Sequence, residues 1–544
     1  MKYIFPWILF GLLPFISCHK DTTGQPADSL SIPEADTWWN NDVFYEIFVR
    51  SFYDSNGDGI GDFKGITEKL DYLNDGNPNT SNDLGITAIW LMPIYPSPSY
   101  HGYDITDYRN VNPQYGTMDD FKHLLSEAHK RGIKIIIDFV INHTSDQHPW
   151  FVNSSSAPNS EKRDWYVWKS YDPGYKGPWG QTVWYEKGGS YYYGLFWSGM
   201  PDLNYRNKLV TAEVEDIARY WYENVGVDGF RMDAAMYLIE DGQNQVNTDA
   251  TKNWWRNFYA FQKNLSPGLM SVGEVWTNTA QVVPYADKRL DYCFEFDLAS
   301  AIIAAAKYGD PTALKSKIME VIDSYPKLQY GTFLTNHDQD RVMNDLGGNT
   351  DMNKLAAGIL LTLPGVPYIY YGEEIGQQGV KPDEDIRRPM QWSSSANAGF
   401  TTGTPWRAPD TNYTTVNVSS EATDSTSLWN YYRKLIHIRS SSDALKLGEY
   451  TEVTSSDPRV MAYLRTTASD AVLVIHNLGS QASPGLKISV SGSPLTQGNY
   501  QLIDKLSGGN FGTLTVTTGG GFAEFTPSVE PGPMTTCILE LSKK

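Results

Sequence analysis

The chain has 544 residues, which is too long for one ordinary hydrophobic core and predicts two or three domains. Its formal net charge is -19 without any basic run, which argues against a nucleic-acid partner, because phosphate binding needs clustered Lys and Arg. The 17 tryptophans and 35 tyrosines supply flat amphipathic rings, which suit the faces of sugars as well as protein cores.

The N-terminus has the pattern of an export signal. Residues 1–17 contain one Lys and an apolar run that is too short to span a bilayer, and Cys18 follows them directly. We predict a signal peptide of the bacterial lipoprotein type at 1–17, with Cys18 as the lipidated first residue of the mature chain. An ordinary secretory peptide is the alternative, since Phe15 fits the lipoprotein pattern less well than Leu at that position.

The mature chain is expected to be exported and lipid-anchored in the cell envelope, at the outer membrane or the cell surface. Residues 18–36 are polar, contain two prolines and predict a flexible tether. No later apolar run is long enough to cross a bilayer, so the lipid is the only membrane contact expected. Only Cys293 and Cys537 remain besides Cys18, so a disulfide framework does not hold the fold together.

The next element is a strand over 43–52 followed by DSNGDGIGD, residues 54–62. Acid or amide side chains alternate there as at the start of an EF-hand calcium loop, but position twelve is Gly65 instead of Glu. One interpretation is a strand-to-loop calcium site with five oxygen ligands: Asp54, Asn56, Asp58, the Ile60 carbonyl and Asp62. The other is an ordinary turn, because Asp, Asn and Gly also cluster where side chains cap their own backbone.

Eight short apolar runs, each ending in polar residues, recur between residues 43 and 374. They are 43–52, 85–94, 132–143, 227–235, 269–276, 290–297, 331–338 and 365–374. Between several of them lie amphipathic segments with apolar residues three or four apart, such as 118–132 and 207–226. This alternation predicts an α/β fold, a (β/α)8 TIM barrel, whose active site lies at the carboxyl ends of the strands.

Two segments depart from this alternation. Residues 144–204 are rich in Trp, Tyr, Gly and Ser without helical periodicity, and this length predicts a loop-rich subdomain inserted after strand 3, on the functional face. From about residue 447 the pattern changes to short strands separated by Gly, Ser and Asn turns, which predicts a C-terminal antiparallel β-sandwich over 447–544. The barrel then comprises 37–143 and 205–446.

Carboxylates follow several of the predicted strands. Arg231 and Asp233 are two residues apart on one strand and point to the same face, so the guanidinium should favour the carboxylate form of Asp233. Glu274 lies beside apolar residues that should raise its pKa and keep it protonated. One nucleophilic carboxylate and one acid, about 5–5.5 Å apart, are what retaining glycoside hydrolysis needs. Asp338, which directly follows His337, supplies a third acid.

A single acid at a strand end is more often a helix cap or an ion-pair partner than a catalytic group. Three acids, two histidines and one arginine at matching ends of different strands are much harder to assign to capping. The chain also carries five motifs in order: DFVINH (138–143), MPDLN (200–204), GFRMDAAMY (229–237), GEVW (273–276) and FLTNHD (333–338). With these motifs the sequence resembles the α-amylase family of retaining α-glucan hydrolases and transferases, from about Trp38 to the end of the chain.

The resemblance implies roles for individual residues. Asp233 would be the nucleophile, Glu274 the general acid/base and Asp338 the stabiliser of the transition state. The expected contacts to the glucosyl unit beside the cleaved bond are Arg231, His143 and His337, with His101 as a polar contact and Tyr103 as a stacking platform. The family likeness also favours calcium, Ca2+, in the loop at 54–62. A second calcium site near Asn142 is in doubt, because Met236 and Tyr237 replace the Lys-His pair of many relatives.

The expected activity is that of an endo-acting α-amylase, which hydrolyses internal α-1,4 bonds of starch, glycogen and maltooligosaccharides with retention. Relatives selective for α-1,6 bonds tend to carry Val after the nucleophile and Gln before PDLN, where this chain has Ala234 and Met200. Exo-acting relatives usually have an Asp-Asn pair before Gly102, where Tyr100 and His101 stand. A monomer that acts on an α-glucan substrate is expected.

Two alternatives stay open. One is an exo-acting α-glucosidase or a transglycosylating relative, since DSNGDGIGDF and RRPMQW (387–392) also resemble segments of those groups. The other is a starch-binding lipoprotein with a dead catalytic fold. The intact set of Asp233, Glu274 and Asp338 opposes this last interpretation, because a pure binding protein has no need of all three.

Overall fold

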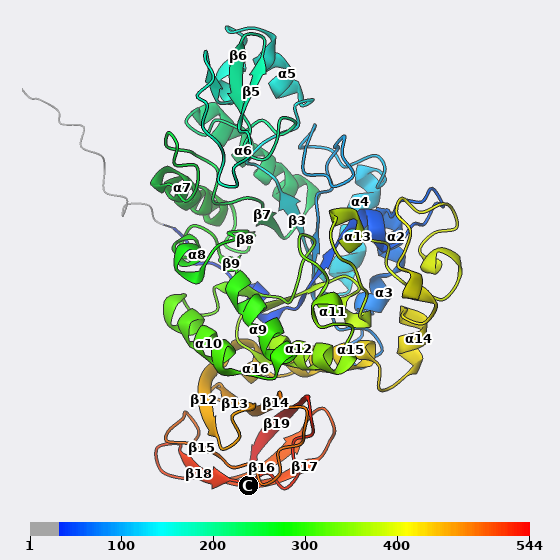
Figure 1. Cartoon of the computed structure of the whole chain (residues 1–544), viewed down its shortest axis with the longest axis vertical. Coiled ribbons are helices and arrows are strands. Elements are labelled where there is room, and N and C mark those ends of the chain that lie inside the picture. The colour runs from blue at the N-terminus through cyan, green and yellow to red at the C-terminus, as the bar shows by residue number, and fades with distance from the viewer. Residues whose placement is uncertain (1–31) are drawn as a thin grey trace, which may run out of the picture.

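The computed structural model of the chain describes residues 32–544 (Figure 1). The predicted signal peptide, Cys18 and most of the predicted tether lie outside the described residues. Eight parallel strands close into a barrel: β1 (Phe44–Ile47), β2 (Ala88–Leu91), β3 (Lys134–Phe139), β7 (Gly229–Met232), β8 (Met270–Gly273), β9 (Tyr292–Phe294), β10 (Tyr330–Thr332) and β11 (Val366–Tyr370). β11 pairs with β1 to complete the ring. The TIM barrel is confirmed: seven strands lie within predicted runs, and β10 begins one residue before its run. The strand predicted over 43–52 is extended only at Phe44–Ile47, because Val49–Phe52 form a short helix.

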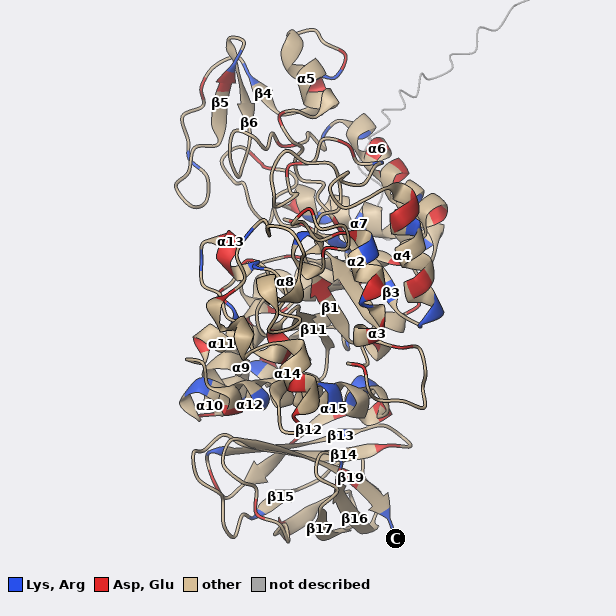
Figure 2. Ribbon diagram, turned by 90° about the vertical axis from the view of Figure 1, so that its right-hand side faces the viewer, with Lys and Arg blue, Asp and Glu red and all other residues tan. Residues whose placement is uncertain are grey.

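Helices surround the barrel because every strand buries both faces and needs a cover on its outer side. The longer ones are α2 (Phe63–Glu68), α4 (Met118–Lys130), α6 (Lys208–Arg219), α7 (Asp249–Leu265), α8 (Thr279–Ala286), α9 (Phe296–Tyr308), α10 (Thr312–Ser324), α12 (Thr350–Thr362) and α15 (Leu428–Ser440). Short helices are α1 (Val49–Phe52), α3 (Leu70–Leu73), α11 (Val342–Asp345), α13 (Asp383–Ile386), α14 (Val418–Thr423) and α16 (Asp443–Leu447). In Figure 2 acidic and basic segments are interspersed along outer helices such as α4.

Local sequence explains where the two predicted amphipathic helices begin and end. α4 starts after Thr117, whose hydroxyl and the Asp120 carboxylate form a reciprocal capping box. The predicted helix at 207–226 starts after Asn207, whose side chain caps the Leu209 N–H. It continues from α6 into a π-helical segment, Tyr220–Val225, and stops at Gly226, which has a φ of 101°.

A small subdomain stands over the carboxyl ends of the barrel strands, at the top of Figure 1. It contains α5 (Pro149–Ser156) and a three-stranded antiparallel sheet of β4 (Trp168–Lys169), β6 (Ser190–Tyr193) and β5 (Trp184–Lys187). A bridge between His143 and Asp202 joins the entry and the exit of the subdomain. The insertion after strand 3 therefore lies on the face that carries the site, as predicted.

The C-terminal domain is an antiparallel β-structure at the opposite end of the molecule (Figure 1). Its strands are β12 (Glu449–Ser455), β13 (Val460–Thr466), β14 (Ala471–Asn477), β15 (Ile488–Val490), β16 (Gly498–Asp504), β17 (Asn510–Val516), β18 (Phe522–Phe525) and β19 (Thr535–Lys543). They form one sheet in the order β17-β16-β19-β14-β13-β12-β15-β18. The edge strands β17 and β18 meet, so the sheet folds over on itself and encloses its own apolar core. Among the described residues no helix is long and apolar enough to span a membrane.

Candidate active site

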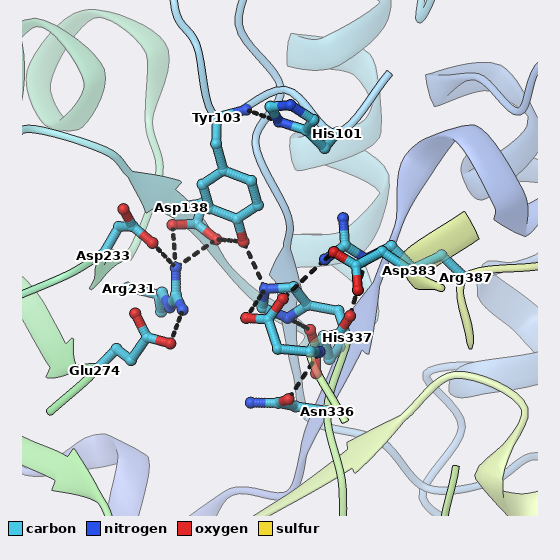
Figure 3. Close-up of polar contacts among 12 residues, drawn as sticks. His101, Tyr103, Asp138, Arg231, Asp233, Glu274, Asn336, His337, Asp383 and Arg387 are labelled. Atoms are coloured by element: carbon cyan, nitrogen blue, oxygen red, sulfur yellow. Dashed lines mark hydrogen bonds and ion pairs between the residues drawn. The ribbon is translucent and has the colours of Figure 1, made fainter. Parts of the chain in front are cut away.

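A cavity of about 700 Å³ opens at the carboxyl ends of the barrel strands, beneath the inserted subdomain. Six of the predicted site residues line it: His101, Tyr103, His143, Asp233, Glu274 and Asp338. Asp233 directly follows β7, and Glu274 directly follows β8, so the barrel itself sets these two carboxylates side by side. The other two predicted residues, Arg231 and His337, are buried, do not line the cavity and contact its acids (Figure 3).

Arg231 is shared by three carboxylates. Its Nη1 lies 2.7 Å from Asp233 Oδ1 and 2.9 Å from Asp138 Oδ1, and its Nη2 lies 3.0 Å from Glu274 Oε1 (Figure 3). The other oxygen of Glu274 accepts a hydrogen bond of 3.1 Å from the N–H of Ala234. Ala234 has a φ of 49°, a strained conformation for a residue with a side chain. The turn after Asp233 is therefore bent so that its backbone orients Glu274.

Burial dominates the protonation of Asp233. It raises the pKa of this carboxyl well above its ordinary range, and the Arg231 guanidinium opposes the rise only in part. This direction is opposite to the one expected from the Arg231 neighbour alone, because the cost of burying the charge exceeds the attraction of the guanidinium. The negative charges of Glu274 and Asp138 raise the pKa of Asp233 further.

Asp338 is held by two cations. His337 Nε2 lies 3.1 Å from Asp338 Oδ2, and Arg387 Nη2 lies 2.8 Å from Asp338 Oδ1. Burial alone would lower the pKa of His337, but the carboxylates of Asp338 and Glu46 raise it to about 9. Burial alone would raise the pKa of Asp338, but His337 and then Arg387 hold it well below its usual range. Asp338 is therefore a permanent negative charge on the wall of the cavity.

Tyr103 links the two groups of charges. Its hydroxyl lies 2.7 Å from His337 Nε2 and donates to Asp138 Oδ2 at 3.1 Å, and its ring stacks on the His337 ring at an interplanar angle of 13°. The pKa of His143 is lowered to about 4 by burial, so its ring is neutral and its Nε2–H donates to the Tyr103 carbonyl. His101 accepts the Tyr103 N–H at Nδ1. The predicted sugar-contacting residues thus form one connected wall.

Sequence reasoning missed four charged residues of this site. Asp138 pairs with Arg231, Glu46 accepts from His337 Nδ1, and both Asp383 and Arg387 line the cavity. Asp138 begins the DFVINH motif, and Arg387 begins RRPMQW. Both residues therefore stand in motifs that the sequence shows, but neither was given a predicted role. Glu46 offered no such signal, because it lies inside an aromatic and β-branched strand.

The loop at 54–62 presents oxygen atoms, but its acids do not converge. Asp54 and Asp62 are buried, whereas Asn56 and Asp58 are exposed. Each of the four side chains accepts backbone N–H groups of the loop itself, and Asp54 also accepts the Thr401 hydroxyl. Within residues 32–544 no group of three or more His, Cys, Asp or Glu side chains is arranged to hold a metal ion. The donor set is that of a hard cation, and Asp54 has no cationic partner among the described residues.

The region of the doubtful second calcium site also offers oxygen ligands. Asn142 donates to Asp202 Oδ2 at 3.1 Å, and its own Oδ1 is buried without a hydrogen-bond partner among the described residues. Burial raises the pKa of Asp202 well above its ordinary range. The replacement of a Lys-His pair by Met236 and Tyr237 leaves these two oxygen donors in place.

Comparison with known proteins agrees with this geometry. Residues 46–448 match the family described as "Alpha amylase, catalytic domain". The chain is 42% identical over 447 residues to Alpha-amylase 3 of Dictyoglomus thermophilum, covering 81% of this chain and 85% of that protein. It is 34% identical over 528 residues to an oligo-1,6-glucosidase of Parageobacillus thermoglucosidasius, covering 83% and 92%. A solved alpha-amylase from H. orenii superposes with a TM-score of 0.80 at 42% identity, covering 92% of this chain and 99% of that one. The chain therefore belongs to the alpha-amylase family and is a glucan hydrolase.

Proposed function

We propose that the protein is an endo-acting α-amylase, which cleaves internal α-1,4-glucosidic bonds with retention of anomeric configuration. The observation that carries this proposal is the open cavity, with Tyr100 and His101 beside it in place of an end-clamping acid and amide. Met200 and Ala234, the two positions that favour α-1,4 over α-1,6 bonds, both line the cavity. The similarity to two alpha-amylases at 42% identity, against 34% for the oligo-1,6-glucosidase, points the same way.

Exposed aromatic side chains around the cavity support binding of several glucosyl units. Trp179 is 59% exposed, Trp197 47% and Trp276 45%, although all three line the cavity. Trp276 stacks on Phe296 with ring centroids 4.7 Å apart, so one face of its indole is held rigid. Flat rings that are exposed and rigid are suited to stack on pyranose faces. Trp184, in the same inserted subdomain, is buried and has a packing role.

The proposed reaction uses the two neighbouring carboxyl groups in turn. An Asp233 oxygen attacks the anomeric carbon while Glu274 donates its proton to the glycosidic oxygen, so the leaving sugar departs as an alcohol and a glucosyl ester remains. Glu274 then takes a proton from water, the water oxygen attacks the same carbon, and the Asp233 carboxylate is released. Two displacements at one carbon give net retention. The fixed negative charge of Asp338 stabilises the positive charge that develops on the sugar ring.

Blocked-end maltooligosaccharides test the mode of attack. An endo enzyme cleaves them and rapidly lowers the viscosity of starch. An exo-glucosidase, the alternative favoured by the oligo-1,6-glucosidase similarity, leaves them intact and releases glucose from unblocked chains. That second outcome would overturn the endo assignment and leave the roles of Asp233, Glu274 and Asp338 standing. A protein that binds starch and cleaves neither substrate would be the binding lipoprotein.

We also propose that Ca2+ binds the loop at 54–62, through Asp54, Asn56, Asp58, the Ile60 carbonyl and Asp62. All five are oxygen donors, which suit this ion, and its role there would be structural. It would hold the segment that follows β1, on the same face of the barrel as the cavity.

We propose in addition that Cys18 carries a lipid that anchors the exported chain to the envelope membrane. The support is the sequence pattern of residues 1–17 and the polar segment after it. In fractionated cells the wild-type protein should be in the membrane fraction, and Cys18→Ala, if it is exported, should be soluble. Wild-type protein that is soluble after export would contradict the lipid anchor.

A further inference from the structure

A second cavity, of about 540 Å³, lies beside the catalytic one on the same face of the barrel, and we name it the Arg50 cavity. It is lined by Arg50, Pro96, Ser97, Pro98, Ser99, Tyr100, Thr106, Asn112, Pro113, Gln114 and Gln147. Tyr100 lines this cavity, and the next residue, His101, lines the catalytic cavity. The two cavities are therefore separated by one loop, and nothing in the proposed reaction uses the second one.

Arg50 gives this cavity a buried donor. Its side chain is 6% exposed and lies near the rings of Tyr115 and Trp406, each 5.8 Å from the guanidinium carbon. Its Nη2 donates to Gln114, but its Nε has no hydrogen-bond partner among the described residues. Leaving a buried donor unpaired costs free energy unless a ligand or water accepts from it. Because Nε itself is fully buried, the donor that a ligand can reach is Nη1, which makes no hydrogen bond within the described residues.

The hydroxyl groups that line the cavity act toward a ligand as hydrogen-bond acceptors, whereas Arg50 is a donor. Ser97 and Ser99 each donate to the carboxylate of Asp104, and Thr106 donates to the Pro96 carbonyl at 3.0 Å. Their hydrogens are engaged within the protein, so toward a ligand these oxygens can only accept. A ligand therefore needs hydroxyl donors for these oxygens and an acceptor for Arg50.

These requirements favour a sugar over an anion. An inorganic anion such as phosphate would meet Arg50, but it would also face the lone pairs of Ser99 and Thr106 with the Asp104 carboxylate behind them. A pyranose unit carries hydroxyl groups that both donate and accept, and C–H faces that suit the proline rings of the lining. The side chain of Gln147, exposed at the rim, can donate and accept as well.

We propose that the Arg50 cavity is a second binding site for glucosyl units of an α-glucan, distinct from the catalytic cavity. The proposal rests on the α-glucan substrate of the proposed function. A long chain that is held in both cavities is bound more tightly than a short one, because the second contact becomes intramolecular. The Arg50 cavity therefore favours long glucan chains.

Binding is tested on the full chain with the Glu274→Gln substitution, which prevents turnover. Titration with maltoheptaose should show a second class of site in addition to the catalytic one. Adding Gln147→Ala should weaken this second class about three- to tenfold through loss of hydrogen bonds. Arg50→Lys keeps the positive charge but removes the planar guanidinium with its Nη1 donor, and should weaken the same class. Gln481→Ala, an exposed glutamine of the C-terminal domain, is the matched control and should leave both classes unchanged.

Kinetics separate this proposal from the endo assignment. In the active enzyme Gln147→Ala should raise KM for amylose about three- to tenfold and leave kcat/KM for a short blocked maltooligosaccharide unchanged. Unchanged maltoheptaose affinity and amylose KM in Gln147→Ala and Arg50→Lys would overturn the proposal. So would inorganic phosphate that binds wild type and is weakened by Arg50→Ala, together with a maltoheptaose titration that shows no second class of site, since the cavity would then be an anion site. Failure to cleave the blocked substrate would count only against the endo assignment.

Discussion

At the scale of single residues, the site is organised by the distribution of a few charges. Arg231 supplies one positive charge to Asp138, Asp233 and Glu274, so the three acids cannot all be ionised at low cost. Burial and the neighbouring acids raise the pKa of Asp233, and the Arg231 guanidinium opposes this rise. Because the first step of the proposed reaction requires Asp233 as a carboxylate, Arg231 acts in favour of that step.

Substitution of Asp233 or Glu274 tests their assigned roles as nucleophile and general acid. Asp233→Asn and Glu274→Gln should each lower kcat on starch by several powers of ten, because they remove the nucleophile and the transferable proton instead of a binding contact. Asp241→Asn, an exposed acid outside the cavity, should retain full activity. Near-normal rate in either catalytic variant, or a product with inverted configuration in wild type, would contradict the assignment.

The raised pKa of His337 predicts a pH dependence of stability. Its pKa rises to about 9 in the folded state, against about 6.5 in an unfolded chain. Because the folded pKa is higher, the stabilisation is complete below pH 6.5 and is lost as the pH rises through about 9. The melting temperature of wild type should therefore fall more steeply between pH 7 and pH 9.5 than that of His337→Gln. His129→Gln, on a half-exposed ion pair, should follow wild type.

Sequence reasoning found the acids of this site but not their partners. Asp233, Glu274 and Asp338 end apolar runs, and the carboxyl ends of barrel strands must meet, so their proximity could be predicted. Arg387 reaches Asp338 from 49 residues further along the chain, and Glu46 reaches His337 from 291 residues away. Contacts of this kind depend on how separate loops pack, and no local pattern encodes them.

At the scale of elements, strands were predicted better than the ends of helices. A strand of the barrel interior must be apolar on both faces, so each of the eight runs is a distinct signal. The helix at 207–226 was predicted in place, but its π-helical last part was not, because no residue pattern in that segment separates a π turn from an α turn. In the loop at 54–62 the side chains accept from backbone N–H groups and from the hydroxyls of Ser55 and Thr401, so the pattern cannot by itself decide whether an ion binds.

Chelation tests whether Ca2+ binds the loop at 54–62. If Ca2+ binds the folded loop, a chelator should lower the melting temperature and added Ca2+ should restore it, since a ligand that binds only the folded state stabilises it. Asp62→Asn should weaken both effects. Asp75→Asn changes a comparable turn, in which Asp75 accepts from the backbone of Asn77, and should leave the response to calcium unaltered. Identical melting curves with and without chelator would return the loop to the turn interpretation.

At the scale of the whole molecule, the buried Arg465 joins the C-terminal domain to the barrel. A second buried arginine, Arg439 on α15, lies within the barrel domain and donates to the carbonyls of Leu361, Leu363 and Gly365, at and beyond the end of α12. Arg465, on β13, donates to the Thr362 carbonyl at 2.6 Å, and neither arginine contacts a carboxylate within residues 32–544. One face of the C-terminal sheet belongs to the same apolar core as the barrel helices. The two domains should therefore unfold as one unit.

Substitution of Arg465 tests whether the barrel and the C-terminal domain unfold together. Arg465→Met should lower the free energy of unfolding by about 2–4 kcal/mol, because the buried carbonyls of Thr362 and Gly448 lose their donor. Arg459→Met, which breaks a surface ion pair in the same domain, should leave the free energy of unfolding nearly unchanged, because exposed ion pairs contribute little. Calorimetry of wild type should give one transition, and Arg465→Met should shift the whole transition to lower temperature. A separate early transition that belongs to the C-terminal domain alone would show that the interface does not couple the domains.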